Sequence, residues 1–218
     1  MDIKDDIDNL LKRYPNLSFT PETNQITGVI KAGINDNYDV RIELGQYPSF
    51  FPHVFETSER IPRKAERHIY TDSNSCCFTT NAKAQVLLKT KITSLSLFIR
   101  DIVIPYFRNN SFYELNGFYS TEEYSHNLFG VIESYQDILK ITNVHQIAKQ
   151  LYNRLNGQKL KLHSPCYCGS PSTLKKCKSG EHLRAYRSFK LIEKATLESD
   201  FHNTFIKLYN KHSTVRNN

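Results

Sequence analysis

The chain has 218 residues, with 29 Lys and Arg against 22 Asp and Glu, and a formal net charge of +7. Its length suffices for one domain and a small appendage. No apolar run is long enough to span a bilayer, and the acidic, amphipathic start is unlike a secretory signal. The odd number of five cysteines argues against a complete disulfide framework. We therefore expect a soluble, cytoplasmic protein with reduced thiols and no membrane partner.

The first third of the chain changes from a helical period to a strand period. Apolar residues at positions 3, 7, 10, 11 and 14 predict an amphipathic helix that Pro15 ends. Alternation over 26–30 and 38–44, around the turn residues 35–37, predicts a hairpin with one packed face. Residues 53–59 predict a third strand. Residues 62–82 have no firm period, and long irregular segments of this kind often carry function.

The rest of the chain is mostly helical in pattern. An apolar stripe predicts a helix over 83–107 that Pro105 bends or ends. Further helices are predicted over 127–140, over 144–155 with Asn156-Gly157 closing it, and from 183 to about 209. We expect an α+β fold in three parts: residues 1–112 with an antiparallel sheet and flanking helices, a helical extension over 113–157, and a small zinc-binding module with a C-terminal helix over 158–218.

Three cysteines near the C-terminal end have the spacing of a metal site. Cys166, Cys168 and Cys177 form C-x-C-x8-C, and His182 follows five residues later. Three thiolates and an imidazole are a suitable tetrahedral set for Zn²⁺. Gly169 permits the tight turn that returns the chain towards the metal, and the segment has few apolar residues with which to fold alone. The sequence therefore predicts a structural Zn²⁺ ion bound by these three cysteines and His182.

The stretch SPCYCGSPSTLKKCKSGEH resembles the SEC-C motif, a short zinc-binding module first named from the SecA translocation ATPase. The family pattern places a Cys or His directly after its third cysteine, and Lys178 stands there in this chain. A protonated lysine cannot bind a metal ion, so we assign the fourth position to His182, with His163 as the alternative. The resemblance covers this stretch alone. It implies zinc binding and no particular function, because the module is an accessory of many unrelated proteins.

The N-terminal half resembles the ubiquitin-conjugating (UBC) family in the order of its elements. That family has a helix, strands with f-x-G-x-i and Y-x-v-x-i patterns, a yP-x-x-P-x-v segment, a loop with a histidine, and then a cysteine. The residues that carry the resemblance are Ile26, Gly28, Ile30, Tyr38, Val40, Ile42, Tyr47, Pro48, Pro52, Val54, His68 and Asn74-Ser75-Cys76-Cys77-Phe78. The resemblance implies a UBC-like fold for the first 112 residues.

In this resemblance Cys77 takes the place of the nucleophile, and Cys76 that of the apolar residue before it. A conjugating enzyme accepts the C-terminal carboxyl of a ubiquitin-like protein as a thioester and passes it to an amine; the thiolate is the attacking species. The site mainly positions the groups and stabilises the oxyanion. The resemblance thus implies Cys77 and His68 as catalytic residues, His68 by orienting the loop. The implied partners are an activating enzyme, a ubiquitin-like modifier and a protein target.

The chain departs from the family at its His-Pro-Asn triplet, which is His68-Ile69-Tyr70 here. The proline and the asparagine that supports the oxyanion are both absent, and Asn74 or Asn81 are alternative amide donors. In these departures the chain resembles diverged, bacterial-type members more than the eukaryotic core family. Such systems often belong to antiviral defence operons beside a metal-dependent deconjugase, so that role is an expectation by analogy.

Several alternatives remain open at this point. A UBC-like domain without catalysis would be an adaptor that binds partners through the basic zinc module, and Cys76 and Cys77 would then be two packed thiols. A cysteine protease that uses Cys77 with His126 or His68 is a less favoured alternative. Glu122 and His126 are more simply part of a polar surface. A zinc-dependent nucleic-acid-binding protein is a third alternative, less favoured because aromatic residues are not interleaved with the basic ones. These basic residues are Lys159, Lys161, Lys175, Lys176, Lys178, Arg184, Arg187 and Lys190.

Overall fold

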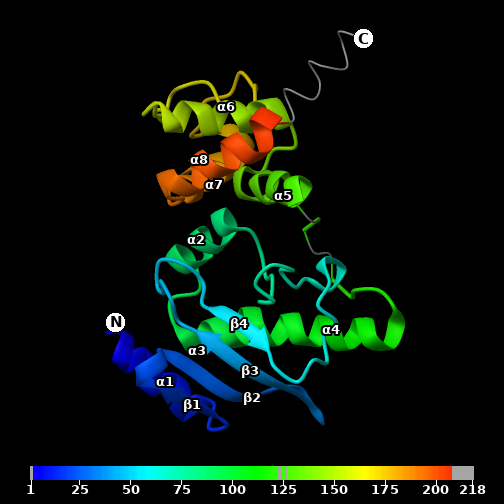
Figure 1. Ribbon diagram of the computed structural model, residues 1–218. Coiled ribbons are helices and arrows are strands. Elements are labelled where there is room, and N and C mark those ends of the chain that lie inside the picture. The colour runs from blue at the N-terminus through cyan, green and yellow to red at the C-terminus, as the bar shows by residue number, and fades with distance from the viewer. Residues whose placement is uncertain (1, 122–123, 126, 208–218) are drawn as a thin grey trace. The chain divides into compact units, whose positions relative to one another are not determined.

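The computed structural model describes residues 2–121, 124–125 and 127–207. Their contacts divide the chain into two compact units, one of residues 2–78 and 87–121 and the other of residues 79–86, 124–125 and 127–207 (Figure 1). Residues 127–157 therefore belong to the same unit as the predicted zinc ligands. The sequence-based boundaries at 112 and 157 stay a prediction. No helix in the described ranges is long and apolar enough to cross a membrane.

The N-terminal unit combines a four-stranded antiparallel sheet, in the order β1-β2-β3-β4, with helices, which confirms the expected α+β class (Figure 1). Helix α1 packs against β1 and α3, and α4 packs against β2. The elements of this unit are α1 (Ile3–Arg13), β1 (Leu17–Thr20), the 3₁₀ turn η1 (Pro21–Thr23), β2 (Gln25–Gly33), β3 (Asp36–Glu43), β4 (His53–Glu56), the 3₁₀ turn η2 (Ala65–Arg67), α3 (Leu95–Phe98), the π-helical turn η3 (Ile99–Val103) and α4 (Ile104–Asn116). Helix α2 (Asn81–Thr90) begins in the C-terminal unit and ends in this one.

The hairpin predicted from alternation is β2 and β3. Ile26 lies opposite Ile42 and Ile30 opposite Tyr38, and all four side chains are buried, because residues that face each other across an antiparallel pair share one face of the sheet. Strand β1 was not expected from the sequence, since its four residues are too few for an alternating pattern. Strand β4 confirms the third predicted strand over a shorter span.

At Gly28 the backbone that leads into β1 lies directly against β2. Its φ angle is +141°, and a Cβ atom there would lie 2.0 Å from the carbonyl oxygen of Asn16. That distance is far inside van der Waals contact, so no other residue fits without a backbone shift. The glycine of the f-x-G-x-i pattern is therefore required by the approach of a neighbouring backbone segment.

The helix predicted over 83–107 is wrong as a single element. Helix α2 ends at Thr90, and α3 starts anew after Ser94, whose side chain accepts a hydrogen bond of 3.2 Å from the amide of Leu97. Pro105 does not end the following helix either. A π-helical turn comes directly before α4, so Pro105 stands in the first turn of that segment, where its missing N–H is tolerated.

The C-terminal unit is helical around an apolar core that includes Tyr135, Leu151 and Phe189. Helix α6 has the predicted bounds, and Gly157 follows it with φ +74°. The single helix predicted from 183 is wrong, because α7 ends at Phe189 and α8 begins at Lys194. Besides the start of α2, the elements are α5 (Asn127–Leu139), α6 (Val144–Leu155), the 3₁₀ turn η4 (Cys177–Gly180), α7 (Glu181–Phe189), α8 (Lys194–Asp200) and the π-helical turn η5 (Phe201–Ile206).

Candidate functional site

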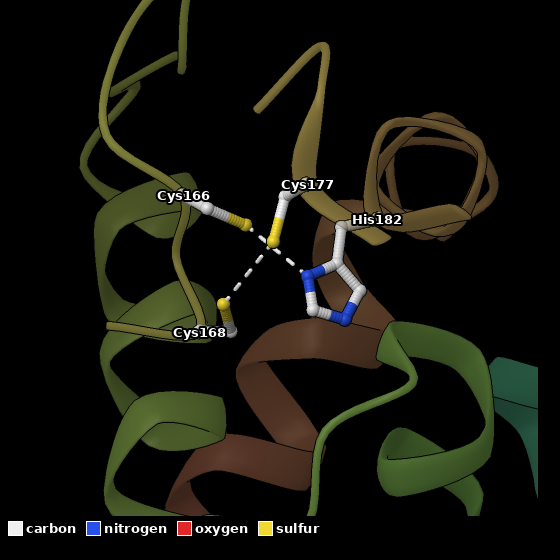
Figure 2. A group of neighbouring side chains, drawn as sticks. All are labelled: Cys166, Cys168, Cys177 and His182. Atoms are coloured by element: carbon white, nitrogen blue, oxygen red, sulfur yellow. Dashed lines mark hydrogen bonds between the residues drawn. The ribbon is translucent and has the colours of Figure 1, made fainter. Parts of the chain in front are cut away.

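The four predicted zinc ligands lie together in the C-terminal unit. The ligand atoms of Cys166, Cys168, Cys177 and His182 are all within 4.8 Å of one another, and they point towards a common centre (Figure 2). Sγ of Cys166 lies 3.2 Å from Nδ1 of His182, and the sulfurs of Cys168 and Cys177 are 3.6 Å apart. Ligands at about 2.0–2.3 Å from a tetrahedral ion are about 3.5–3.8 Å from one another. The cluster therefore has the composition and the size of a metal site.

A small hairpin presents the first two cysteines. Pro165 and Thr173 form an isolated antiparallel bridge, and the amide of Cys166 donates to the carbonyl of Ser172 over 3.0 Å. Between them, the amide of Gly169 donates to the carbonyl of Cys166 over 3.1 Å in a tight turn, where the glycine has φ +83°. The left-handed conformation is readily available to glycine, which explains the C-x-C-G sequence of this turn.

His182 reaches the cluster through an unusual turn of the backbone. After Cys177, Lys178 and Ser179 both have left-handed conformations, with φ of 44° and 52°, and Gly180 continues at 82°. Helix α7 starts directly after this turn, and His182 is its second residue. The turn takes up the residues between the third and fourth ligands. This is the physical reason why a histidine five residues beyond Cys177 stands beside the thiols.

The other nitrogen of the His182 ring has a partner too. Nε2 lies 3.2 Å from the carbonyl oxygen of Lys140, and the whole residue is buried. A carbonyl is only an acceptor, so Nε2 carries the proton and Nδ1 presents its lone pair to the thiols. Metal-bound histidines usually donate their other ring N–H to such an acceptor, which fixes the ring orientation and tautomer.

The thiols differ in their proton affinity without a metal. Burial raises the pKa of Cys166 to about 12. Burial also acts to raise the pKa of Cys168, but the backbone amide of Ser170 and the neighbouring thiols outweigh it, so that pKa is lowered. Buried neutral thiols bind a cation by releasing protons. Lys175, Lys176 and Lys178, which flank Cys177 in the sequence, are exposed, and their positive charge would offset that of thiolates bound to a metal ion.

Cys76 and Cys77 occupy different environments in the N-terminal unit. Ile69 and Cys76 face each other in an isolated antiparallel bridge, and both are 4% exposed. The amide of Cys76 donates to the carbonyl of Val54 over 2.7 Å, which anchors the bridge to β4. Burial raises the pKa of Cys76 to about 12, so its thiol stays protonated and inert. Cys77 is only half-buried.

His68 holds Cys77 through its backbone. The amide of Cys77 donates to the carbonyl of His68 over 2.7 Å, and the same carbonyl accepts from the hydroxyl of Tyr106 over 2.9 Å. His68 has a left-handed backbone with φ 50°, and its ring packs edge-on against Tyr119, with 5.2 Å between the ring centroids. The structure thus joins His68 to Cys77 by a main-chain hydrogen bond. Catalytic roles for the two residues stay predictions.

Tyr70 is the residue that the sequence reading missed. It stands where the UBC family has asparagine, and burial together with the neighbouring thiol of Cys77 raises the pKa of its hydroxyl. In the sequence, the signal for Tyr70 is its position two residues after His68. Of the other candidates, Glu122 and His126 lie outside the described residues. Asn74 has φ +62° in the turn that follows Tyr70.

Comparison with protein-family models, with curated proteins and with solved structures finds no match to this chain. The functional argument therefore rests on the residues and geometry of the two clusters.

Proposed function

We propose that the chain is a conjugating enzyme of the UBC type that accepts a ubiquitin-like modifier as a thioester on Cys77 and transfers it to an amine. The observation that carries the proposal is the different placement of two adjacent thiols. Cys76 is packed into the core, whereas Cys77 is half-buried and held by its backbone at the end of a long irregular segment. A nucleophile must be reachable by a partner's carboxyl group and still be fixed in position.

The fold around Cys77 supports this proposal. The UBC resemblance implies a first helix, antiparallel strands, a loop with a histidine and a cysteine, and later helices. The N-terminal unit has α1, then the four-stranded sheet, then the irregular segment, then α3 to α4. A shared order of elements is an argument about fold, and the proposed chemistry rests on Cys77 and its surroundings.

For the second cluster we propose a structural Zn²⁺ ion bound by Cys166, Cys168, Cys177 and His182. Three sulfurs and one imidazole nitrogen suit zinc better than magnesium or calcium, which prefer oxygen ligands. Four protein ligands complete a tetrahedral shell and leave no open position for a substrate. The ion would therefore fasten the hairpin and the left-handed turn to the start of α7, and the basic surface around it would contact a protein partner.

The test is a non-reducing gel after co-expression of the chain with the genes that neighbour its own. We expect an adduct of the size of the modifier that a thiol reductant removes. Cys77→Ala should abolish the adduct, and Cys76→Ala is the matched control that should keep it, because Cys76 is buried and protonated.

The outcome separates the proposal from its main alternative. If the activating enzyme is shown to be active and no variant forms an adduct, the thioester proposal is wrong. A modifier that then co-purifies equally well with the wild type and with Cys77→Ala would favour the non-catalytic adaptor. Salt-sensitive binding of nucleic acid, lost on neutralising the lysines at 175, 176 and 178, would contradict both.

A further inference from the structure

The loop from His68 to Cys77 is a small hairpin-like turn. Its two arms, residues 68–70 and 75–77, pair in an antiparallel register. The bridge between Ile69 and Cys76 places His68 opposite Cys77 and Tyr70 opposite Ser75. The amide of Tyr70 donates to the carbonyl of Ser75 over 2.9 Å, and that of Cys77 to the carbonyl of His68 over 2.7 Å. Tyr70 is thus the diagonal neighbour of Cys77 across the pair.

This register places Tyr70 and Cys77 on one face. Side chains alternate along each arm, so Ile69 and Cys76 point into the core while Tyr70 and Cys77 point to the opposite side. Diagonal neighbours of an antiparallel pair are within reach of a long aromatic side chain. Burial and, after it, the neighbouring thiol of Cys77 raise the pKa of the Tyr70 hydroxyl, as expected for two side chains on the same face of the pair.

Short contacts fix the turn that joins the two arms. The amide of Asn74 donates to the carbonyl of Tyr70 over 2.7 Å, and Asn74 takes the left-handed conformation that closes the turn. The hydroxyls of Ser73 and Ser75 are 2.9 Å apart, and the amide of Ser73 donates to the carboxylate of Asp72 over 2.9 Å. A turn that is hydrogen-bonded within itself holds Tyr70 at a constant place relative to Cys77.

We propose that Tyr70 is a catalytic residue that donates a hydrogen bond from its hydroxyl to the oxyanion formed when an acyl group on Cys77 is attacked. The inference rests on the proposed function. It supplies a hydrogen-bond donor to the oxyanion in place of the family's asparagine, which this chain lacks. Tyr70 stands at the position of that asparagine in the sequence, and the register of the loop places it diagonally across from Cys77.

The reaction step balances without any further reagent. The amine nitrogen bonds to the carbonyl carbon of the thioester, and the electron pair of the C=O bond moves to the oxygen. Tyr70 stabilises this oxyanion by a hydrogen bond and keeps its own proton. The C=O bond then re-forms, the C–S bond breaks, Cys77 leaves as a thiolate, and the proton of the amine passes to solvent.

The protonation state of Tyr70 suits a donor. Partial burial raises the pKa of its hydroxyl above the usual value, and the neighbouring Cys77 and Asp72 act in the same direction. A phenol with a raised pKa remains protonated at neutral pH and above. The residue is 43% exposed, so an acyl group on Cys77 can approach it from solvent.

The test uses the full chain with its metal. Cys77 is acylated with the 2-mercaptoethanesulfonate thioester of N-acetyl-Gly-Gly, and peptide mapping identifies the cysteine that carries the acyl group. After removal of the reagent, free lysine is added and loss of the acyl group is followed by intact mass. We expect Tyr70→Phe to slow aminolysis about tenfold or more. Removing a buried oxyanion donor lowers a rate by a factor of about 10²–10³, and the effect is smaller here because the site is partly exposed. Tyr70→Asn should restore part of the rate, because an amide is also a donor.

Two controls separate oxyanion stabilisation from a structural effect. Tyr152→Phe removes the hydroxyl of a 54% exposed tyrosine on α6 and should leave the rate unchanged. Alkylation of Cys77 by iodoacetamide passes through no oxyanion, so Tyr70→Phe should change it by less than about threefold. Equal slowing of alkylation and aminolysis would overturn the inference, because it would mean that Tyr70 only positions the sulfur.

The two proposals fail in different ways. If the wild type is acylated and Tyr70→Phe loses its acyl group as fast as the wild type, the role of Tyr70 is wrong and the proposed function stands. If the folded wild-type thioester reacts with lysine no faster than the same chain unfolded in guanidinium chloride, the proposed function fails, and the inference fails with it.

Discussion

The hydroxyl of Tyr47 donates a hydrogen bond of 2.6 Å to Oδ2 of Asp6, a buried carboxylate on the first helix. The amide of Leu95, at the start of α3, donates to both oxygens of the same carboxylate over 3.0 and 3.1 Å. Asp6 thus joins three segments of the N-terminal unit that are far apart in the sequence. The carboxylate also caps α3, since it lies at the positive end of that helix.

Asp6→Ala should lower the free energy of unfolding by about 3 kcal/mol, because it leaves two buried donors without an acceptor. Urea titration followed by circular dichroism measures the change. Asp8→Ala is the matched control on the exposed side of the same helix and should change stability by less than about 0.5 kcal/mol. Equal effects of the two substitutions would show that Asp6 contributes no more than a surface residue.

Gly28→Ala should destabilise the N-terminal unit by about 3 kcal/mol, because the new Cβ must displace the backbone of Asn16 or shift β2. Gly33→Ala, in the same strand, places its Cβ 3.4 Å from the Cβ of Asp36 and should cost less than about 1 kcal/mol. Urea midpoints of the two variants give the comparison. A tolerated Gly28→Ala would contradict the close approach of β1 to β2.

The purified chain should contain one zinc ion, measured by inductively coupled plasma mass spectrometry. Cys177→Ser and His182→Ala should lose most of the metal, whereas His163→Ala should keep it. Chelation should lower the melting temperature, because the segment between α6 and α7 has little apolar surface of its own. Substitution by Co²⁺ should give the visible absorption of a tetrahedral sulfur-rich site. Full metal content in His182→Ala with loss in His163→Ala would reverse our assignment of the fourth ligand.

Asp137 on α5 should contribute to stability at neutral pH and lose that contribution in acid. Lys140 and Tyr124 donate to its carboxylate over 2.6 and 2.8 Å, and Lys83 on α2 is a further partner. Burial acts to raise the pKa of Asp137, but these hydrogen bonds outweigh it and hold the pKa well below its usual range.

The direction of the pH effect follows from that lowered pKa. The contribution is complete above the unfolded-state value of about 4 and disappears as pH falls from there towards the folded-state value. Melting temperatures between pH 2 and 7 should therefore fall more steeply for the wild type than for Asp137→Asn. The candidate metal site of Cys166, Cys168, Cys177 and His182 is the same in both proteins, so the difference between the two curves isolates Asp137. Parallel curves would show that the carboxylate is not stabilised in the folded state.

The sequence alone determined the features that depend on neighbours a few residues apart. Alternation predicted β2 and β3, and helical spacing with Asn156-Gly157 predicted α6, because a strand face or a helix face repeats within a few residues. Thiol spacing and the C-x-C-G turn likewise predicted the composition of the metal cluster.

Tertiary contacts decided what these local signals leave open. The two cysteines at 76 and 77 are chemically equal in the sequence, and only the bridge from Ile69 to Cys76 decides which of them is buried. Pro105 predicts a bend or an end of the helix, and in the structure α4 continues past it directly after a π-helical turn. Tyr70 stands where the UBC family has asparagine, and only the register of its loop makes it the diagonal neighbour of Cys77. The physical reason is the same in each case: burial and cross-chain register depend on segments that meet only when the chain has folded.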